Sequence, residues 1–432
     1  MTFPSTALLT DHYELTMLQA ALATGHAHRP CVFEAFARRL PDGRRYGVVA
    51  GTGRILEALG DFRFGAAEVD FLSNAGVVDD TTLEYLSRYR FTGDMWGYAE
   101  GECYFPGSPL LVVESSFAEG VILETLILSV LNHDSAVASA ASRMTAAAGD
   151  RPCIEMGSRR THEESAVAAA RAAYIAGFTA TSNLEAGRRH GVPTMGTAAH
   201  SFTLLHDSER SAFESQLSSL GSSTSLLVDT YDIASGVGLA VELAGHALGG
   251  VRLDSGDLVS GAHDVRKQLD DLGAINTRIV VTSDLDEFAI AALQAAPVDS
   301  YGVGTNVVTG SGAPTAGMVY KLVSRADASG HMEPVAKVSR DKRSVGGRKY
   351  ALRRRNSTGV AQEEIIGIGA APTDDGDDRE LLVELVHGGK VVAGTDAEAA
   401  RARHAASRSE LPTRAMQLSH GEPAIDTTYL NG

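Results

Sequence analysis

Seven short apolar runs recur between residues 153 and 303, and they constrain the fold more than any other feature of the sequence. The segments between them, such as residues 258–272, repeat apolar side chains with helical periodicity. Strands that alternate with helices are typical of a parallel sheet with crossover helices. The pattern therefore predicts a barrel or a doubly wound sheet. The runs are residues 153–156, 178–181, 193–196, 226–229, 251–254, 279–283 and 300–303.

Polar residues at the ends of these runs favour the barrel. A barrel assembles its active site from several strand ends at once, whereas a doubly wound sheet concentrates it at one switch point. We therefore expect an irregular seven-stranded parallel α/β barrel. The residues at the ends of the runs or shortly after them are Glu155, Arg159, Thr197, His200, Asp229, Asp254, Asp284 and Thr305.

The flanking segments predict a second, α+β domain built from both ends of the chain. Residues 1–115 form its N-terminal part, residues 116–310 the barrel with the catalytic site, and residues 311–432 a β-rich segment packing back on the first. Helices are expected at 11–23, 68–89 and 396–407, and an acidic loop at 370–378. Strands are expected at 31–40, 46–50, 318–323, 334–338, 349–353 and 381–386.

The net charge and the cysteine content limit the binding partners and the cellular compartment that we expect. The net charge of −16 disfavours nucleic acid and anionic membrane surfaces. The apolar run 120–131 is short and contains Glu124, so no transmembrane helix is expected. Three cysteines without CxxC spacing fit a reduced, cytoplasmic setting.

The segment 251–257 (VRLDSGD) carries the strongest chemical signal. Arg252 and Asp254 come from the strand, and Asp257 follows a glycine turn. Two carboxylates flanking a turn can hold Mg²⁺, directly or through water, or accept hydrogen bonds from sugar hydroxyls. For Asp257 the alternative is a helix N-cap.

His200 and Asp229 form a second candidate pair. A Gly-Thr turn brings His200 to a strand end, where a neutral imidazole can act as base, metal ligand or phosphoryl acceptor. Asp229 can orient an imidazole, although a turn aspartate is an equal alternative. A purely structural histidine is likewise the alternative for His200.

Phosphate binding is expected from glycine loops and arginines. Gly302, Gly304 and Thr305 follow the last run, where backbone N–H groups can wrap a phosphate. Arg159 and Arg160 can bind a carboxylate or phosphate through two hydrogen bonds, or be a surface pair. No lysine precedes Lys267, and neither a complete Walker motif nor a GxGxxG fingerprint is present.

Together these segments resemble the nicotinate phosphoribosyltransferase family, within the type II phosphoribosyltransferases. The resemblance begins at residues 9–17 (LTDHYELTM) and covers most of the chain. It implies transfer of a phosphoribosyl group from phosphoribosyl pyrophosphate to nicotinate in NAD salvage, with coupled ATP hydrolysis and Mg²⁺. It also implies a ligase by classification and a cytoplasmic homodimer with its active site at the interface. The matching segments are 33–34, 104–106, 155–160, 182–183, 196–201, 229–232, 252–257, 283–284 and 301–305.

The resemblance also implies a role for each candidate residue. His200 matches the histidine that ATP phosphorylates, and Asp229 the acid that orients it. Asp254 and Asp257 match carboxylates near the ribose, pyrophosphate and Mg²⁺. Tyr13 matches an aromatic residue that the second subunit stacks on the pyridine ring. The remaining substrate-binding candidates are Arg159, Ser182, Asn183, Thr197, Ser201, Arg252, Ser283, Asp284, Gly302, Gly304 and Thr305.

Ser182 and Asn183 bear on acid against amide selectivity. The related nicotinamide-using family places an aspartate near this position, and its absence here, with arginines nearby, favours the acid. The alternatives are a nicotinamide or quinolinate phosphoribosyltransferase, or a non-catalytic metabolite-binding barrel. An aldolase or isomerase barrel would need a lysine or glutamate base at a strand end, and the first six runs contain no lysine.

Overall fold

The computed structural model describes residues 5–337 and 344–430, and the chain divides into two compact units. The terminal unit combines Met1–Ser139 with Thr315–Gly432, and the central unit is Ala140–Pro314. Each unit is described by itself. The sequence-based boundaries at residues 115 and 310 stay predictions.

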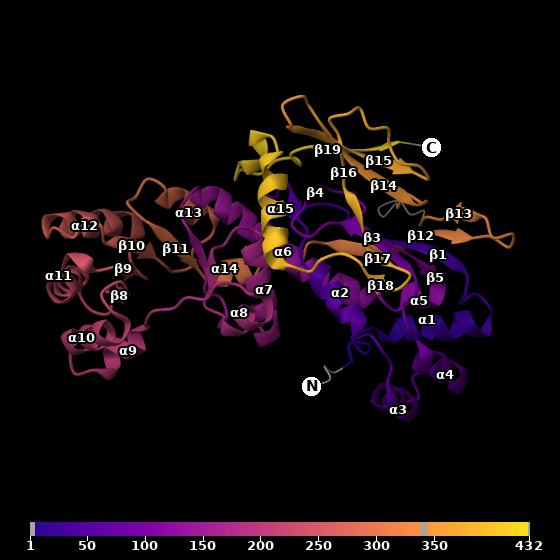
Figure 1. Ribbon diagram of the computed structural model, residues 1–432, viewed down its shortest axis with the longest axis horizontal. Helices are drawn as coiled ribbons and strands as arrows, with labels where there is room; N and C mark the ends of the chain where they lie inside the picture. The colour runs from indigo at the N-terminus through magenta and orange to yellow at the C-terminus, as the bar shows by residue number, and fades with distance from the viewer. Residues whose placement is uncertain (1–4, 338–343, 431–432) are drawn as a thin grey trace. The chain divides into compact units, whose positions relative to one another are not determined.

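The central unit contains a parallel sheet in the order β7-β6-β11-β10-β9-β8. Figure 1 labels its strands β8 to β11. Six of the seven apolar runs therefore form strands, and neighbouring strands keep a parallel register, as between Val281 and Leu253. The strands are β6 (Cys153–Glu155), β7 (Ala180–Thr181), β8 (Ser225–Leu227), β9 (Gly250–Leu253), β10 (Arg278–Val281) and β11 (Ser300–Val303).

The run at residues 193–196 makes only one parallel bridge, between Thr194 and Thr181. The Thr181 N–H donates to the Pro193 carbonyl (2.9 Å), and the Met195 N–H donates to the Thr181 carbonyl (3.0 Å). Because Pro193 has no N–H, it cannot donate to a ladder on either side. Within the described residues the sheet thus has six strands, and the seventh predicted run contributes one bridge; the closed seven-stranded barrel stays a prediction.

Helices connect the strands of the central unit. In α12 the Asp257 side chain accepts from the Ser260 N–H, and Ala262, Val265 and Leu269 form the buried face. The predicted helix at 258–272 is therefore confirmed. The helices are α7 (Glu163–Ile175), α8 (Leu184–His190), α9 (His200–Leu205), α10 (Glu209–Leu220), α11 (Ile233–Ala244), α12 (Leu258–Asp271), α13 (Glu287–Leu293) and α14 (Thr305–Val308).

The terminal unit has an antiparallel sheet in the order β13-β12-β1-β5-β3-β17-β18. Strands from the N-terminal segment form its centre and strands from the C-terminal segment flank them on both sides, since β12 pairs with β1 and β17 pairs with β3. The expected strand at 334–338 is shifted toward the N-terminus, and residue 338 lies outside the described residues. The strands are β1 (Pro30–Ala37), β3 (Asp94–Tyr98), β5 (Leu111–Ser116), β12 (Met318–Ala326), β13 (Met332–Pro334), β17 (Leu382–His387) and β18 (Lys390–Val391).

A second sheet of the terminal unit has the order β16-β14-β15-β19, and β2 pairs with β4. Its strands are β14 (Lys349–Arg355), β15 (Ala361–Ile368), β16 (Arg379–Glu380) and β19 (Asp426–Leu430), with the ribbon β2 (Gly47–Val48) and β4 (Cys103–Tyr104). The helices are α1 (His12–Ala23), α2 (Thr52–Gly60), α3 (Ala66–Asn74), α4 (Asp80–Arg88), α5 (Phe117–Val121) and α15 (Ala397–Ser409).

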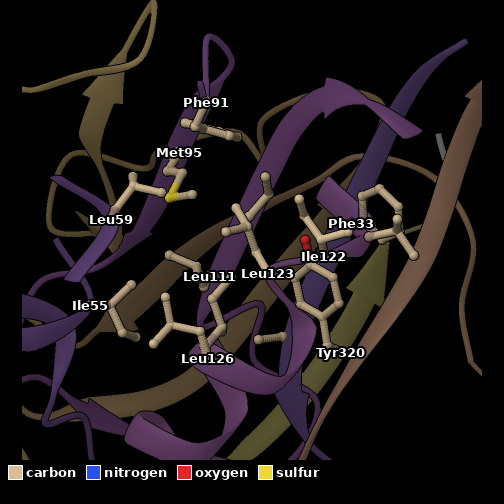
Figure 2. Close-up of a cluster of buried hydrophobic side chains, with 14 of the residues drawn as sticks. Phe33, Ile55, Leu59, Phe91, Met95, Leu111, Ile122, Leu123, Leu126 and Tyr320 are labelled. Atoms are coloured by element: carbon tan, nitrogen blue, oxygen red, sulfur yellow. The ribbon is translucent and has the colours of Figure 1, made fainter. Parts of the chain in front are cut away.

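The main core of this unit lies on one face of the seven-stranded sheet. Figure 2 shows Phe33, Met95, Leu111 and Tyr320 gathered with side chains from the helices, and the rings of Phe33 and Tyr320 stack at 5.1 Å. Alternation along each strand sends the neighbouring residues to the opposite face. There Val32, Val112 and Val323 form a smaller cluster, against which Trp96 and Leu382 pack.

One helix expectation is corrected. The single helix expected at 68–89 is two helices, because Gly76 adopts φ +61 and Asp79 caps the second one by accepting from the Thr82 N–H. The run 120–131 spans the end of α5 and the start of the 25-residue helix α6 (Glu124–Ala148), which continues from the terminal unit into the central one. Among the described residues, 117–148 is the one helical segment long and apolar enough to cross a membrane, but 67% of its apolar window is buried inside the protein, as in a core helix.

A buried ion network fixes the C-terminal half of the terminal unit. The Arg353 guanidinium is fully buried and donates to Glu102 (2.7 Å) and to Glu364. Arg379 donates to Glu102 (2.8 Å) and to Glu410 (2.7 Å). Despite burial, these arginines hold the pKa of Glu102 down at about 2. The network therefore ties β14, β15 and β16 to the chain around Glu102.

We predict that Arg353→Met destabilises the protein by about 3–5 kcal/mol, because it leaves buried carboxylates without their cation. Chemical denaturation measures the loss. The control Arg88→Met breaks an exposed pair with Glu84 and should cost less than ~1 kcal/mol. Equal effects of the two substitutions would contradict the assignment.

A second prediction concerns His404, which is buried in α15. Burial lowers its pKa to about 4, and its Nδ1 donates to the Gly101 carbonyl. The unfolded chain, with an ordinary pKa of about 6.5, takes up the proton first as the pH falls. The contribution of His404 to stability is therefore present above pH ~6.5 and is lost progressively toward pH ~4. His404→Gln should flatten this part of the pH dependence of the unfolding free energy; an unchanged slope would exclude His404 as its source.

Candidate active site

The predicted site residues of the central unit lie at the carboxyl ends of its strands, or in the loops that follow. In a parallel sheet these ends meet at the same edge, which is where ligands bind in α/β folds. Asp229 follows β8, Asp254 follows β9, Ser283 follows β10 and Gly304 follows β11. The sheet therefore gathers side chains that are far apart in the sequence.

His200 lies close to two of these carboxylates. It is the first residue of α9, and its Nε2 is 3.8 Å from Asp229 Oδ1 and 3.8 Å from Asp254 Oδ2. Its Nδ1 lies 3.1 Å from Thr230 Oγ1, within hydrogen-bond distance. The imidazole is 39% exposed, so it borders both acids and remains accessible to a ligand.

Asp229 has a buried side chain that serves two purposes. Its Oδ2 accepts from the Asp254 N–H (2.8 Å) and from the Ser255 hydroxyl (3.0 Å). Its Oδ1 is buried and has no hydrogen-bond partner among the described residues. Because an unpaired buried oxygen is costly, the atom favours a proton on the neighbouring His200 Nε2. Asp229 is thus placed to orient the imidazole.

Asp254 and Asp257 differ in what they offer a ligand. Asp254 Oδ1 accepts from the Thr282 hydroxyl, and its Oδ2 faces His200 with the side chain 39% exposed. Asp257 is exposed, and its Oδ1 caps α12 through the Ser260 N–H (3.1 Å). The N-cap alternative for Asp257 is therefore present in the structure.

The side chains of this site suit Mg²⁺ with one carboxylate, that of Asp254, as the main protein ligand. Mg²⁺ is usually held by one or two carboxylates together with substrate phosphates, and Asp254 Oδ2 suits that role. A closed cage of three protein ligands is absent here: in the described part of the chain, the one such acidic group is Asp374, Asp375 and Asp378 in the terminal unit.

Arg252 supplies positive charge beside these acids. Its Nη1 donates to Thr197 Oγ1 (3.0 Å), while its Nε is buried without a partner among the described residues. Burial lowers the pKa of Arg252; Asp254 and Asp229 oppose this effect, and Arg159 adds to it by repulsion. Two guanidinium groups close enough to repel each other favour an anion between them.

The loops after β10 and β11 are tied to each other. Asn306 Nδ2 donates to the carbonyls of Asp284 (3.1 Å) and Leu285 (3.2 Å). Ser283 adopts φ +136, a strained conformation for a residue other than glycine. The predicted ribose and phosphate loops thus form one connected structure, with Gly304 and Thr305 at the start of α14.

Glu155 links the loop that carries Arg159 to the loop that carries Ser182 and Asn183. Its buried carboxylate accepts from the Gly157 N–H and the Thr181 hydroxyl, and burial raises its pKa. Asn183 caps α8 by accepting from Ala186 N–H (2.9 Å) and donates to Ser158 Oγ (3.0 Å). Asn183 therefore has a structural role, whereas Ser182 is exposed.

Tyr13 and Ser201 lie on helices rather than at strand ends. Tyr13 lies in α1 of the terminal unit and is 45% exposed. Partial burial and the nearby acids Glu124, Glu14 and Asp11 raise its pKa to about 12. Ser201 is exposed in α9. Their roles stay predictions.

Three hydroxyl residues were missed by the sequence reasoning. Thr230 contacts His200, Ser255 donates to Asp229, and Thr282 donates to Asp254. Each is adjacent in sequence to a residue that the sequence does single out. The sequence signal that could have identified them is a serine or threonine next to a candidate residue at a strand end.

Comparisons with known proteins agree with one another. A family model for the nicotinate phosphoribosyltransferase (NAPRTase) N-terminal domain matches residues 8–132. The chain is 59% identical over 429 residues to nicotinate phosphoribosyltransferase pncB1 of Mycobacterium tuberculosis, covering 97% of this chain and 94% of that protein.

Two solved structures share the fold. The crystal structure of human nicotinic acid phosphoribosyltransferase has a TM-score of 0.83 at 26% identity, with 97% of both chains covered. Nicotinate-nucleotide pyrophosphorylase from Pyrococcus furiosus has a TM-score of 0.77 at 22% identity, with 94% of this chain and 95% of that chain covered. The second likeness shows the fold alone.

The tight packing at Gly302 generates a prediction. A Cβ there would lie 2.5 Å from Thr282 Cγ2 and 2.8 Å from Met156 Sδ. Gly302→Ala should therefore destabilise the protein by about 1–3 kcal/mol through overpacking. Gly261→Ala, in α12 with open space around it, should be neutral or stabilise by up to ~1 kcal/mol. Denaturant titration of both variants tests this, and a neutral Gly302→Ala would contradict the packing.

Proposed function

The chain belongs to the nicotinate phosphoribosyltransferase family, and from this membership we infer that it joins nicotinate to the phosphoribosyl group of phosphoribosyl pyrophosphate. The products are nicotinate mononucleotide and pyrophosphate, a step of NAD salvage. The observation that carries this function is the 59% identity to pncB1 over nearly the whole of both chains.

The chemistry of the transfer suits the charges at the strand ends. As pyrophosphate departs, its bond to the ribosyl carbon breaks and positive charge develops on that carbon. The exposed oxygen of Asp254 is available to stabilise this charge, and Arg252 and Arg159 to hold the anionic leaving group. The pyridine nitrogen attacks with its own lone pair, so it needs no general base.

We propose Mg²⁺ as the metal of this site. When bound, it would neutralise charge on the pyrophosphate. Asp254 would be its main protein ligand, and Asp257 the second candidate, directly or through water. The support is the accessible carboxylate oxygen that Asp254 presents beside His200.

We further propose that ATP phosphorylates His200. Asp229 beside Nε2 favours the tautomer with the proton on that nitrogen, which leaves the lone pair on Nδ1. Nδ1 then bonds to the γ-phosphorus of ATP, the bond to the bridging oxygen breaks, and ADP leaves with that electron pair. Water later cleaves the N–P bond and releases phosphate. A phosphoryl group adds ~−2 charge beside Asp254 and Arg252, which can alter how the site holds Mg²⁺ and phosphoribosyl pyrophosphate.

Selectivity for the acid follows from the charges around the proposed nicotinate site. Arg252 and Arg159 attract a substrate carboxylate, and no aspartate occupies position 182 or 183 to repel it. We therefore propose nicotinate over nicotinamide. Ser283, Asp284, Gly302, Gly304 and Thr305 are proposed to hold the ribose and its 5′-phosphate.

Three further features of the family are proposals for this chain. The parallel sheet would close as a seven-stranded barrel through residues 193–196, with support from the Thr181–Thr194 bridge. The protein would form a homodimer in which Tyr13 of a second copy reaches the pyridine ring. A cytoplasmic location is supported by the free, buried cysteines Cys31, Cys103 and Cys153.

One assay tests the proposed function. The purified protein is incubated with phosphoribosyl pyrophosphate, Mg²⁺ and either nicotinate, nicotinamide or quinolinate, with and without ATP. Nicotinate mononucleotide should form fastest, with ADP released in step. If nicotinamide or quinolinate reacted faster than nicotinate, the proposed substrate would be wrong. If none of the three gave a product, the result would favour the non-catalytic alternative.

His200→Ala should separate the two half-reactions. ATP hydrolysis should fall by at least about 10²-fold because the phosphoryl acceptor is gone, while weak ATP-independent transfer persists. The control His206→Ala removes an imidazole at the end of the same helix, where Nδ1 donates to the Phe202 carbonyl, and should retain both activities. Equal loss of hydrolysis and transfer in His200→Ala would overturn the division of roles.

A further inference from the structure

The terminal unit contains a cavity of about 510 Å³ built entirely from its own residues. This volume lies in the range typical of small-molecule sites. Its floor comes from the face of the seven-stranded sheet opposite the main core. Its lining includes Asp94, Trp96, Glu114, Arg348, Tyr350, Glu380, Leu382 and Glu384.

Two aromatic rings give the cavity flat apolar walls. Trp96, the single tryptophan of the chain, lies on β3 and packs with Leu382 against the small valine cluster. Tyr350 faces the cavity from β14. The start of β14 is anchored by a buried ion pair in which Lys349 Nζ is 2.7 Å from Glu34 Oε2 on β1. The aromatic walls are thus fixed before any ligand arrives.

A guanidinium group already lies against these rings. Arg348 Cζ is 4.4 Å from the centre of the Tyr350 ring and 5.9 Å from that of Trp96. Its Nε donates to Glu114 Oε1 at 2.7 Å. Arg348 is therefore an example, within the protein, of a planar cation held between aromatic rings and a carboxylate.

Arg348 does not balance the acids of the cavity. Four carboxylates line it (Asp94, Glu114, Glu380 and Glu384) against that one guanidinium and the imidazole of His387. His387 Nδ1 is 2.8 Å from Glu384 Oε1 and 3.8 Å from Asp94 Oδ1, so these two carboxylates already face one imidazole. Asp94 and Glu114 are direct cross-strand partners, and Glu384 is opposite Trp96. Like charges directly opposite each other on a sheet destabilise it unless a cation lies near. The excess negative charge repels anions and attracts a cation.

We propose that this cavity binds a small organic cation, an amidinium or guanidinium group carried on a flat apolar body. The cation would lie over Trp96 with its charge toward Asp94 and Glu384, while Arg348 keeps its place on Tyr350 and Glu114. This chemistry is opposite to that of the central-unit site, whose proposed ligands are all anions.

Benzamidine tests the proposal, because at neutral pH it is a planar amidinium on a phenyl ring. Titration into the full-length protein should quench the fluorescence of Trp96 saturably, with a Kd of about 0.1–1 mM. Benzamide has nearly the same shape but no charge, and it should bind at least about tenfold more weakly. Because the chain has one tryptophan, the signal reports on this cavity.

Variants locate the site. Glu384→Gln and Asp94→Asn preserve side-chain shape, and each should weaken benzamidine binding at least about threefold. Glu57→Gln removes an exposed acid of α2 that does not line the cavity, and Arg252→Ala alters the central unit; both should leave the Kd unchanged. Thermal melting of each variant verifies that it is folded.

The proposal fails if quenching rises linearly to about 10 mM without saturation, since contact would then be collisional. It also fails if benzamide binds as tightly as benzamidine, if both cavity variants bind like the parent, or if Arg252→Ala abolishes binding. None of these outcomes depends on phosphoribosyl transfer, so they are read independently of the proposed enzyme activity.

Discussion

The buried carboxylate of Asp229 connects the segments from which the candidate active site is built. One oxygen fixes the turn after β9 through Asp254 and Ser255, and the other lies beside His200 at the start of α9. Three separate parts of the chain thus depend on one side chain. Its burial keeps the charge away from water, so the field on the imidazole is stronger than a surface aspartate would produce.

The sequence predicted the central unit well because its signals are local. Apolar runs of four or five residues, each followed by a polar residue, indicate both the strands and the edge where the site lies. The sequence did not identify the hydroxyl residues Thr230, Ser255 and Thr282, since they matter through contacts between different strand ends. The sequence analysis also did not predict the helix break near Gly76 or the weak strand pairing at Pro193, although both residues are visible in the sequence. In the terminal unit, pairing of β1 with β12 and of β3 with β17 joins residues hundreds of positions apart, which no local pattern specifies.

The preference for arginine over lysine has a physical reason at this site. Burial lowers the pKa of Arg252, yet a guanidinium begins so far above neutrality that it keeps its charge. A lysine in the same partly dehydrated position would be much easier to neutralise. The net charge of −16 is therefore no guide to a single site: Arg252 lies beside Asp254, Asp229 and Arg159, whereas acids outnumber the one arginine in the Trp96 cavity.

The interleaving of the two units has a consequence for synthesis on the ribosome. The central unit is one uninterrupted stretch, so all of its strands emerge together, whereas β1 must wait for β12, which lies beyond that entire stretch. Until β12 and Lys349 have been synthesised, one edge of β1 is unpaired and the Glu34 carboxylate lacks the cation of its buried ion pair. Long-range pairing of this kind slows folding and exposes nascent chains to association. The first third of the polypeptide is thus the part that a chaperone would have to shield longest, although it is made first.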